Sequence, residues 1–269
     1  MRELENKLVI VRGGGDLATG VIHKLSRCGF LVLALECPRP SAIRRHVAFS
    51  EAVYEGVQTV EGMTCLLASG ASEALSMVAP HKPVMLVDPE AEILKQVKPW
   101  ALVDAVLAKR NLGTNRRMAD RTIALGPGFT AGEDVDLVIE TKRGHQLGRI
   151  IESGEAAANT GIPGIICGYG KERVIHAPAE GILHCVRSIA DVVEEGELLA
   201  FIRTKEGEDV PVAATLTGIL RGILRDGYPV TKGFKTADID PRQSERVNCD
   251  TISDKARCLA GAVLEAILR

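Results

Sequence analysis

HAPAEGILHCVRSIADVVEEGELLAFI (176–202) and VAATLTGILRGILRDGYPVTKGFKTADID (212–240) are two copies of one pattern. Five positions recur without a gap, 37 residues apart (218 − 181): Gly181 and Gly218, Ile182 and Ile219, Leu183 and Leu220, Val193 and Val230, Gly196 and Gly233. A duplicated β-unit of this kind buries its apolar face only when the copies pack together. We therefore predict a small closed β-sandwich in the second half of the chain.

The repeat resembles the barrel-sandwich of biotinyl and lipoyl domains. In each half, one glycine begins a predicted strand and a second glycine follows in a later turn. Attachment domains of that class present a modifiable lysine at a hairpin tip between the two halves. Lys205, in RTKEGEDVP (203–211), lies in this stretch but lacks the Met-Lys-Met or Asp-Lys-Ala surroundings of an attachment site. The resemblance thus implies a module without covalent biotin or lipoate.

The first hundred residues alternate between buried-strand and helical patterns. LVIVR (8–12) leads through three glycines into a helical pattern, and LVLALE (31–36) follows. Near-continuous Val and Leu runs predict a parallel sheet that is covered on both faces, with right-handed crossovers. Further strands are expected at 64–69, 84–88 and 102–108, and helices at 41–56, 71–79 and 91–97. The predicted fold class is therefore an α/β Rossmann-like parallel-sheet domain joined to a β-rich domain that contains the duplicated module.

Four segments follow from these patterns. We expect a Rossmann-like domain over 1–110, a β-rich bridge over 111–160, the duplicated module over 161–245, and a C-terminal helix within 246–269 that packs on the core. Ser253 is the expected N-cap of that helix, since a serine side chain can accept a hydrogen bond from the first helical turn.

Composition narrows the classes of function. The 269 residues carry a formal net charge of −2 and only 3% aromatic residues, which excludes the dense basic or stacking surface of a nucleic-acid binder. The apolar run near the N-terminus is too short for a signal peptide or a membrane span, so we expect a cytoplasmic protein. Seven cysteines without CxxC or zinc-ligand spacing predict free, mostly buried thiols. Oligomerisation stays open.

The strongest candidate site is the glycine turn after the first strand. Gly13, Gly14, Gly15, Asp16 and Ala18 match G-x-G-x-x-A, in which glycines allow an anion to approach the start of a helix. Glu36 ends the second strand, where a Rossmann carboxylate binds ribose hydroxyls. Asp16 would repel a pyrophosphate. The pattern therefore leaves two alternatives, a nucleotide or pterin-phosphate site and a similar scaffold without a dinucleotide.

Other polar residues could join this site or serve the fold. Ser69 and Asp88 end predicted strands and Lys109 follows one, so all three would share the carboxyl edge of the sheet, although Asp88 before a proline also fits a simple turn. One of Arg44 and Arg45 could bind an anion, or both could be solvated.

Two further groups are weaker candidates. Gly126 and Gly128 could form a backbone anion nest, with Arg143 and His145 beyond them for acid–base or oxyanion chemistry. Asp238 and Asp240 share one face of a strand and are weak metal candidates, which Arg242 could instead neutralise.

Six separated blocks resemble one family, the selenium-dependent molybdenum hydroxylase system proteins, also called YqeB. The blocks are VRGGGDLATGVIHKL (11–25), IRRHVAFSEAVYEG (43–56), LGPGFTAGEDVDLVIETKRGHQLG (125–148), NTGIPG (159–164), DIDPR (238–242) and SDKARCLAGAVLEAIL (253–268). The N-terminal half is also similar to the Rossmann part of xanthine dehydrogenase accessory proteins. The family offers no established catalytic residues to carry over, so enzyme activity stays open.

The resemblance implies an accessory or maturation factor that binds or modifies the molybdenum cofactor (molybdopterin) for a selenium-dependent molybdenum hydroxylase. Its expected partners are the hydroxylase apoenzyme or cofactor-maturation proteins. Two alternatives remain at this stage. One is an NAD(P)-dependent oxidoreductase that uses Gly13, Gly15 and Glu36, and the other is a non-catalytic scaffold for the hydroxylase.

Overall fold

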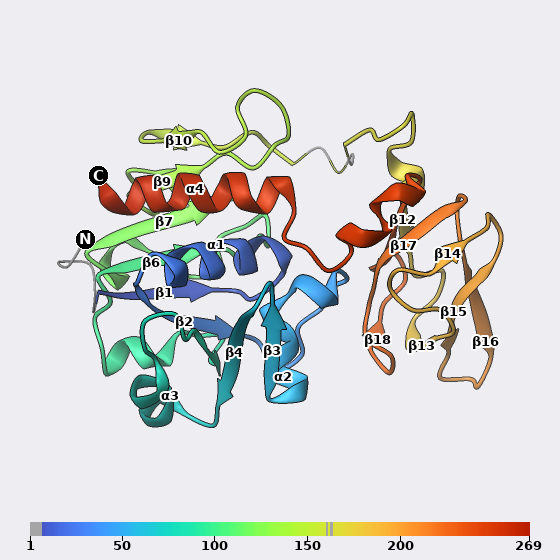
Figure 1. Cartoon of the computed structure of the whole chain (residues 1–269), viewed down its shortest axis with the longest axis horizontal. Coiled ribbons are helices and arrows are strands. Elements are labelled where there is room, and N and C mark those ends of the chain that lie inside the picture. The colour runs from blue at the N-terminus through green and yellow to red at the C-terminus, as the bar shows by residue number, and fades with distance from the viewer. Residues whose placement is uncertain (1–6, 160, 162–163) are drawn as a thin grey trace. The chain divides into compact units, whose positions relative to one another are not determined.

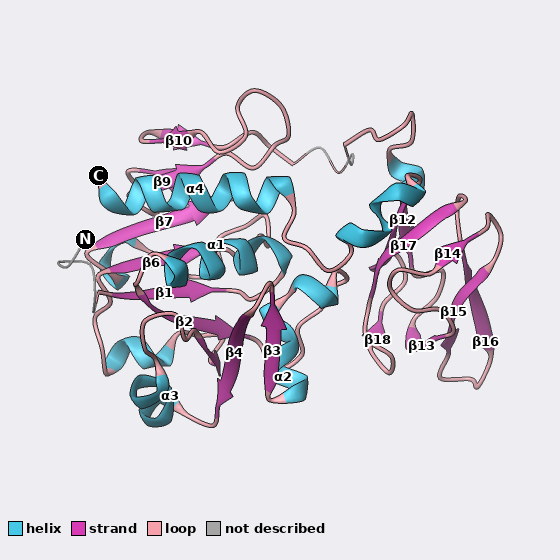
Figure 2. Ribbon diagram, viewed as in Figure 1, coloured by secondary structure: helices cyan, strands magenta, loops and turns pink. Residues whose placement is uncertain are grey.

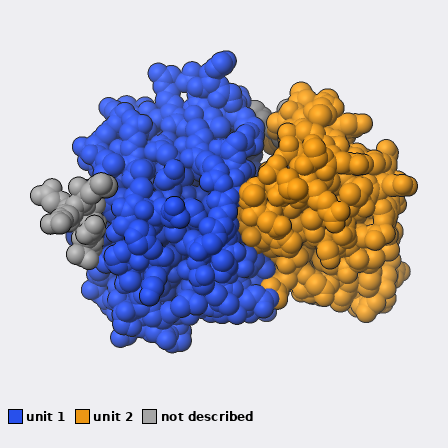
Figure 3. Space-filling model, in the orientation of Figure 1, with its two compact units in different colours: residues 1–40, 48–160, 252–269 blue, residues 41–47, 161–251 orange. Residues whose placement is uncertain are grey.

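A computed structural model describes residues 7–159, 161 and 164–269 of the chain. It divides into two compact units (Figure 3), unit 1 with residues 1–40, 48–160 and 252–269, and unit 2 with residues 41–47 and 161–251. The block NTGIPG falls partly outside the described residues, at 160, 162 and 163. None of the helices in the described ranges has the length and apolarity needed to cross a membrane.

Unit 1 is built on a mixed, mostly parallel nine-stranded sheet (Figure 2). Its strands, in spatial order, are β10 (Ile150–Ile151), β9 (Leu137–Ile139), β7 (Arg121–Leu125), β6 (Ala101–Asp104), β1 (Leu8–Arg12), β2 (Leu31–Glu36), β5 (Val84–Val87), β4 (Met63–Ala68) and β3 (Val57–Val60). Only the two edge strands, β3 and β10, pair antiparallel with their neighbours. The central strands are almost wholly buried, as near-continuous Val and Leu runs predict.

Two long helices of unit 1 lie side by side (Figure 1), α1 (Asp16–Arg27) and α4 (Asp254–Leu268). They approach closely because Gly20 has no side chain, and a Cβ there would lie 2.8 Å from the carbonyl oxygen of Ala256. Ser253 caps α4 as predicted, since its Oγ accepts the N–H of Ala256 at 3.2 Å. The unit also has the short helices α2 (Ala52–Glu55) and α3 (Ala71–Met77).

The predicted helix over 41–56 is wrong. This segment instead forms 3₁₀ turns at Arg45–Val47 and Phe49–Glu51 before the single turn of α2. Residues 41–47 belong to unit 2, where Arg44 donates to the carbonyls of Asn248 and Thr251, and Arg45 donates to that of Ile223. These tertiary hydrogen bonds hold the backbone in a non-helical path. The segment 91–97 likewise forms only a 3₁₀ turn, at Glu92–Lys95.

The expected bridge over 111–160 supplies strands to unit 1. β7 and β9 extend the large sheet in parallel, and β8 (Thr130–Ala131) pairs with β11 (Gly154–Glu155) in a separate two-stranded sheet. The C-terminal helix also belongs to this unit, where Arg121 of β7 donates to the carbonyl of Ala266 in α4.

Unit 2 contains two four-stranded antiparallel sheets. The first has the order β12 (Val174–His176), β19 (Lys235–Asp240), β17 (Gly218–Ile223), β14 (Val192–Val193), and the second β16 (Asp209–Ala213), β15 (Leu198–Arg203), β13 (Gly181–Cys185), β18 (Pro229–Val230). The sequence period carries β13 onto β17, β14 onto β18 and β15 onto β19. It also carries β12 onto β16, so exchanging equivalent strands of the two copies converts the second sheet order into the first. Each sheet therefore takes two strands from each copy, which neither copy could supply alone.

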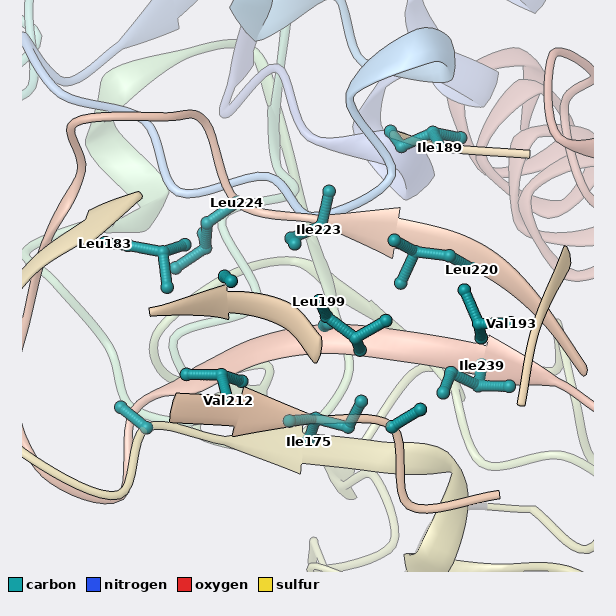
Figure 4. Close-up of a cluster of buried hydrophobic side chains, with 14 of the residues drawn as sticks. Ile175, Leu183, Ile189, Val193, Leu199, Val212, Leu220, Ile223, Leu224 and Ile239 are labelled. Atoms are coloured by element: carbon teal, nitrogen blue, oxygen red, sulfur yellow. The ribbon is translucent and has the colours of Figure 1, made fainter. Parts of the chain in front are cut away.

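The two sheets share one apolar core (Figure 4). Equivalent positions are buried alike, because Leu183 and Leu220 are both fully buried, as are Ile202 and Ile239. Register is equivalent too, since Leu183 pairs with Ile202 as Leu220 pairs with Ile239. The repeat in the sequence is thus a repeat of structure, with the same register up to Leu183 and Leu220; beyond Leu220 a β-bulge shifts the register of the second copy by one residue.

All seven cysteines are free thiols, but the expectation that most are buried is wrong. Cys65 and Cys249 are buried, whereas Cys28, Cys167 and Cys258 are exposed. Burial raises the pKa of the Cys65 thiol to about 12, so that thiol stays protonated at neutral pH.

Candidate functional site

The order in which successive strands join the parallel sheet reverses at β1. From β1 the sheet runs through β2, β5 and β4 to one side, whereas β6 and the later strands lie on the other side. Gly13 follows β1 and Ala105 follows β6, and a Cβ on Gly13 would lie 3.0 Å from the carbonyl oxygen of Ala105. The glycine turn therefore lies at the switch point of the sheet, where open α/β sheets bind their ligands.

The three glycines of this turn differ in whether backbone conformation or neighbouring atoms exclude a side chain at their positions. Gly13 has a φ of +96° and meets Ala105, so its conformation and its surroundings both favour glycine. A Cβ on Gly14 would lie 2.7 Å from Cε of Met85 and 3.0 Å from the amide nitrogen of Ser50. Gly15 has a φ of −65°, which any residue adopts, and nothing lies within 4 Å of its Cβ direction. The fold thus requires Gly13 and Gly14, whereas Gly15 leaves an open space at the start of α1.

Glu36 lies beside this turn, at the end of β2. Its carboxylate accepts the N–H of Gly14 and the N–H of Cys37, each at 2.8 Å. The side chain predicted to bind ribose thus supports the glycine turn through hydrogen bonds of its own. Burial, with the nearby Glu36 carboxylate, raises the pKa of the Cys37 thiol to about 11, so this cysteine is a poor nucleophile at neutral pH.

A lysine that sequence reasoning missed lies close to the start of α1. Lys255 is the second residue of α4, and burial together with Arg143 lowers the pKa of its ammonium group, against the opposing effect of Asp16, Glu140 and Asp254. Asp16 is the first residue of α1, so this electrostatic interaction links the first turns of the two helices. Ala18, one turn into α1, is buried and packs in the core. Nothing in the residues around Lys255 predicts this proximity, because 239 positions (255 − 16) separate it from Asp16 in the sequence.

Arg143 is near this cluster but is held by α4. Its guanidinium makes a two-pronged ion pair with Asp254, with N–O distances of 2.9 and 3.1 Å. Glu140 is buried and accepts the N–H groups of Lys142 and Ala157, so it orders the loop that carries Arg143. His145 is exposed on the same loop, without a hydrogen bond to any described residue.

The glycines of the 125–148 block are explained by the chain itself. A Cβ on Gly126 would lie 2.7 Å from Oγ1 of Thr141, and one on Gly128 would lie 2.6 Å from the amide nitrogen of Arg110. These close approaches hold the segment after β6 against the loops after β7 and β9. Gly126 and Gly128 therefore lie at the same edge of the sheet as Gly13, as packing positions.

The other polar residues of the edge serve local structure. Asp88 caps the 3₁₀ turn after β5 by accepting the N–H groups of Glu92 and Ile93, which is the turn role that the sequence left open. The Ser69 amide and hydroxyl both donate to Glu73. Lys109 is exposed beside Gly128.

The paired carboxylates of unit 2 are engaged by arginines. Asp240 accepts two hydrogen bonds from Arg242, at 3.0 and 2.8 Å, and Asp238 lies 3.6 Å from Arg173 and 3.8 Å from Arg221. Among the described residues no group of three or more His, Cys, Asp or Glu side chains is arranged to hold a metal ion.

Ser50 is a second residue that the sequence did not single out. It is fully buried against Gly14, and its amide donates to the Gly14 carbonyl at 2.8 Å. Its Oγ has no hydrogen-bond partner among the described residues. The glycine turn is therefore covered on the side of Gly14 by a segment with an unsatisfied hydroxyl.

Comparison with known proteins identifies a relative of unassigned function. No family model matches the chain. It is 48% identical to uncharacterized protein YqeB of Escherichia coli (strain K12) over 263 residues, which is 98% of this chain. The two are homologues. The chain spans about half the length of that relative, 48% of it.

Solved structures show only distant similarity. A succinylglutamate desuccinylase/aspartoacylase from Rhodobacter sphaeroides is 12% identical with a TM-score of 0.30, covering 87% of this chain and 85% of that one. An aspartoacylase family protein from Mesorhizobium loti gives 10% and 0.30 with the same coverage. The ectoine utilization protein EutE (DoeB) from Ruegeria pomeroyi gives 12% and 0.27, covering 87% and 86%. TM-scores this low support no argument about function.

Proposed function

We propose that this protein is an accessory factor for a selenium-dependent molybdenum hydroxylase and that its unit 1 binds the phosphate of the molybdenum cofactor at the N-terminus of α1. In this proposal unit 1 is a Rossmann-like binding domain and unit 2 is a barrel-sandwich that carries no covalent cofactor. The protein acts in the cytoplasm, where its partners are the hydroxylase apoenzyme or cofactor-maturation proteins.

The open space at Gly15 is the observation that carries the proposal. Gly13 and Gly14 are needed by the backbone or by their neighbours, whereas neither the φ of Gly15 nor any contact within 4 Å requires a glycine there. A glycine that the fold does not need, at the first turn of a helix and at the switch point of a sheet, suits the close approach of a ligand backbone or phosphate.

The electrostatics of this edge suit a phosphate monoester. The first turns of α1 and α4 both present backbone N–H groups and the positive ends of their dipoles. Lys255 belongs to the first turn of α4, and its lowered pKa reflects burial that a bound anion would compensate. The carboxylate of Asp16 opposes an anion, so the phosphate has to lie nearer Lys255 than Asp16.

Two further observations support an accessory role. The six sequence blocks resemble the molybdenum hydroxylase system proteins and include the whole glycine turn and the start of α4. In unit 2, Lys205 is ion-paired with Glu180 at 2.8 Å, so this hairpin lysine has a structural partner. We accordingly assign unit 2 to protein contacts rather than to cofactor attachment.

A thermal-shift titration tests the proposal. A ligand that binds only the native state adds about 2.7 kcal/mol of stability at a hundredfold excess over its Kd. We expect isolated molybdenum cofactor to raise the Tm of the wild-type protein. Gly15→Asp should abolish that rise, because its carboxylate would occupy the open space and repel the phosphate.

Gly70→Asp is the matched control. Gly70 is also an N-cap glycine with open space around its Cβ direction, at the start of α3. Its variant should keep the full shift with the cofactor. If the pterin cofactor has no effect on wild-type Tm, with or without hydroxylase, the proposal fails.

The second candidate is the NAD(P)-dependent oxidoreductase. It is favoured by the position of Glu36, which lies at the end of β2 within hydrogen-bond reach of the glycine turn. A shift with NAD(H) or NADP(H) that Gly15→Asp abolishes would select this function over the accessory role.

A further inference from the structure

A second basic cavity lies at the opposite end of α1 from the glycine turn. It has a volume of about 320 Å³ and lies between α1, α4 and the turn that joins β3 to β4. Lys24 and Arg27 from α1, Arg257 from α4 and Glu61 from the hairpin line it, together with His23. Its side chains include three permanent cations and a single carboxylate.

The one carboxylate is already engaged. Glu61 accepts hydrogen bonds from Arg257 and, at 2.9 Å, from the N–H of Ile252. Lys24 and Arg27 form no ion pair with any residue in the described ranges. The cavity therefore presents uncompensated positive charge, which predicts an anionic ligand.

His23 adds a feature that charge alone does not explain. One edge of its ring hydrogen-bonds to the backbone of Glu61, while Nε2 is buried and has no partner among the described residues. Burial lowers the pKa of the imidazole, so it is neutral at pH 7. With the hydrogen of the neutral imidazole on Nδ1, Nε2 is a hydrogen-bond acceptor.

Glu61 has a left-handed backbone, with a φ of +47°. Glu61 and Gly62 both have positive φ and form the two-residue turn of the β3–β4 hairpin, where this conformation is the usual one. The hydrogen bonds that Glu61 makes with Arg257, Ile252 and His23 hold the hairpin tip against the start of α4. Residues that line the cavity are thus held in place by hydrogen bonds to one another.

We infer that this cavity binds a phosphate oxyanion that retains a hydroxyl group, with Lys24, Arg27 and Arg257 holding its charge and Nε2 of His23 accepting its hydrogen. Orthophosphate and a hydroxylated phosphomonoester share this chemistry, and the volume admits either. The inference does not depend on the proposed function, because it concerns another site and another ligand.

The test compares phosphate with sulfate. At about pH 8 orthophosphate keeps one P–OH group, whereas sulfate has no hydrogen to donate. A site with a buried acceptor rejects a ligand that leaves the acceptor unpaired. By isothermal titration calorimetry at equal ionic strength, we expect orthophosphate to bind at least about tenfold more tightly than sulfate. Equal affinities, or no binding of either anion, would overturn the inference.

Variants assign the binding to this cavity. Lys24→Gln combined with Arg27→Gln should weaken phosphate binding by at least about tenfold, because charge-assisted hydrogen bonds are lost. Arg269→Gln, which removes one charge at the far end of the same helix pair, should leave the affinity unchanged. Phosphate binding that survives the double variant would overturn the inference.

His23→Leu tests the acceptor. It should reduce the preference for phosphate over sulfate to about unity while sulfate binding stays the same. A preference that survives in a folded His23→Leu protein would overturn the role of Nε2, and the wild-type comparison stands if this variant does not fold. Glycerol 3-phosphate in a parallel titration identifies the source, since tighter binding than orthophosphate would select an organic phosphate.

Discussion

The two units use glycine differently. In unit 2, Gly181 and Gly218 occupy equivalent positions, and a Cβ at either would lie 2.2 or 2.4 Å from the carbonyl oxygen of the paired strand. In the glycine turn of unit 1, Gly13 and Gly14 are also packed against the chain, but Gly15 is not. The difference separates glycines that allow two backbone segments to pack closely from a glycine that no neighbouring atom requires.

The largest expected effect is in unit 2. Gly181→Ala and Gly218→Ala each force a Cβ into the carbonyl of Arg203 or Asp240, and each should destabilise the protein by about 2–4 kcal/mol. Chemical denaturation of the two variants measures this. If the repeat is structurally equivalent, the two losses should agree within about 1 kcal/mol. A loss confined to one copy would break the equivalence of the two copies.

The next effect sharpens the contrast within the glycine turn. Gly14→Ala should lower the free energy of unfolding by about 1–3 kcal/mol, because its Cβ would crowd Met85 and the backbone of Ser50. Gly15→Ala should change it by less than about 0.5 kcal/mol. Denaturant titration at pH 7 compares them, and equal losses would show that Gly15 is also a packing glycine.

Lys255→Met should raise stability at neutral pH by roughly 0.5–1 kcal/mol, since a half-buried charge is replaced by an apolar chain. The folded pKa of Lys255 lies below its unfolded value, so the charged form destabilises the native state at low and neutral pH. Wild-type stability should then rise as pH increases from the folded pKa toward the unfolded value of about 10.4, and the variant should lack this rise. A variant that is less stable than wild type at pH 7 would contradict this account.

Arg143→Gln is expected to have the smallest effect. Both partners of its ion pair with Asp254 are exposed, so the loss of stability should be less than about 0.5 kcal/mol at physiological salt. The affinity of this variant for the molybdenum cofactor is the second measurement. An unchanged affinity would confine the anion site to the helix N-termini and Lys255, whereas a large loss would add Arg143 to it.

Local patterns predicted much of the secondary structure. The alternation of strand and helix led to β1, α1, β2, β4, α3, β5 and β6 with small shifts at their ends, and serine capping located the start of α4. The helix over 41–56 failed because its backbone groups find partners elsewhere, such as the Gly14 carbonyl for the amide of Ser50. The glycine turn was recognisable as a site because its spacing is local.

The rest of the candidate site had no local signal. Lys255 meets Asp16 because α4 returns to pack beside α1, and His23 faces Arg257 for the same reason. Neither lysine nor histidine stands out in its own segment. Burial and missing partners, which mark both residues as candidates, are properties of the folded chain.

By itself the sequence determined that unit 2 consists of two equivalent β-rich copies, because a period of fixed length repeats the same pattern of glycine and apolar residues. It also located the glycine turn of unit 1. Only the tertiary structure decided that each sheet of unit 2 takes two strands from each copy, since strand pairing depends on which edges meet after both copies form. The tertiary structure alone also decided that the space around the Cβ direction of Gly15 is empty, whereas that of Gly13 and Gly14 is filled. Open space is set by neighbours that lie far away in the sequence.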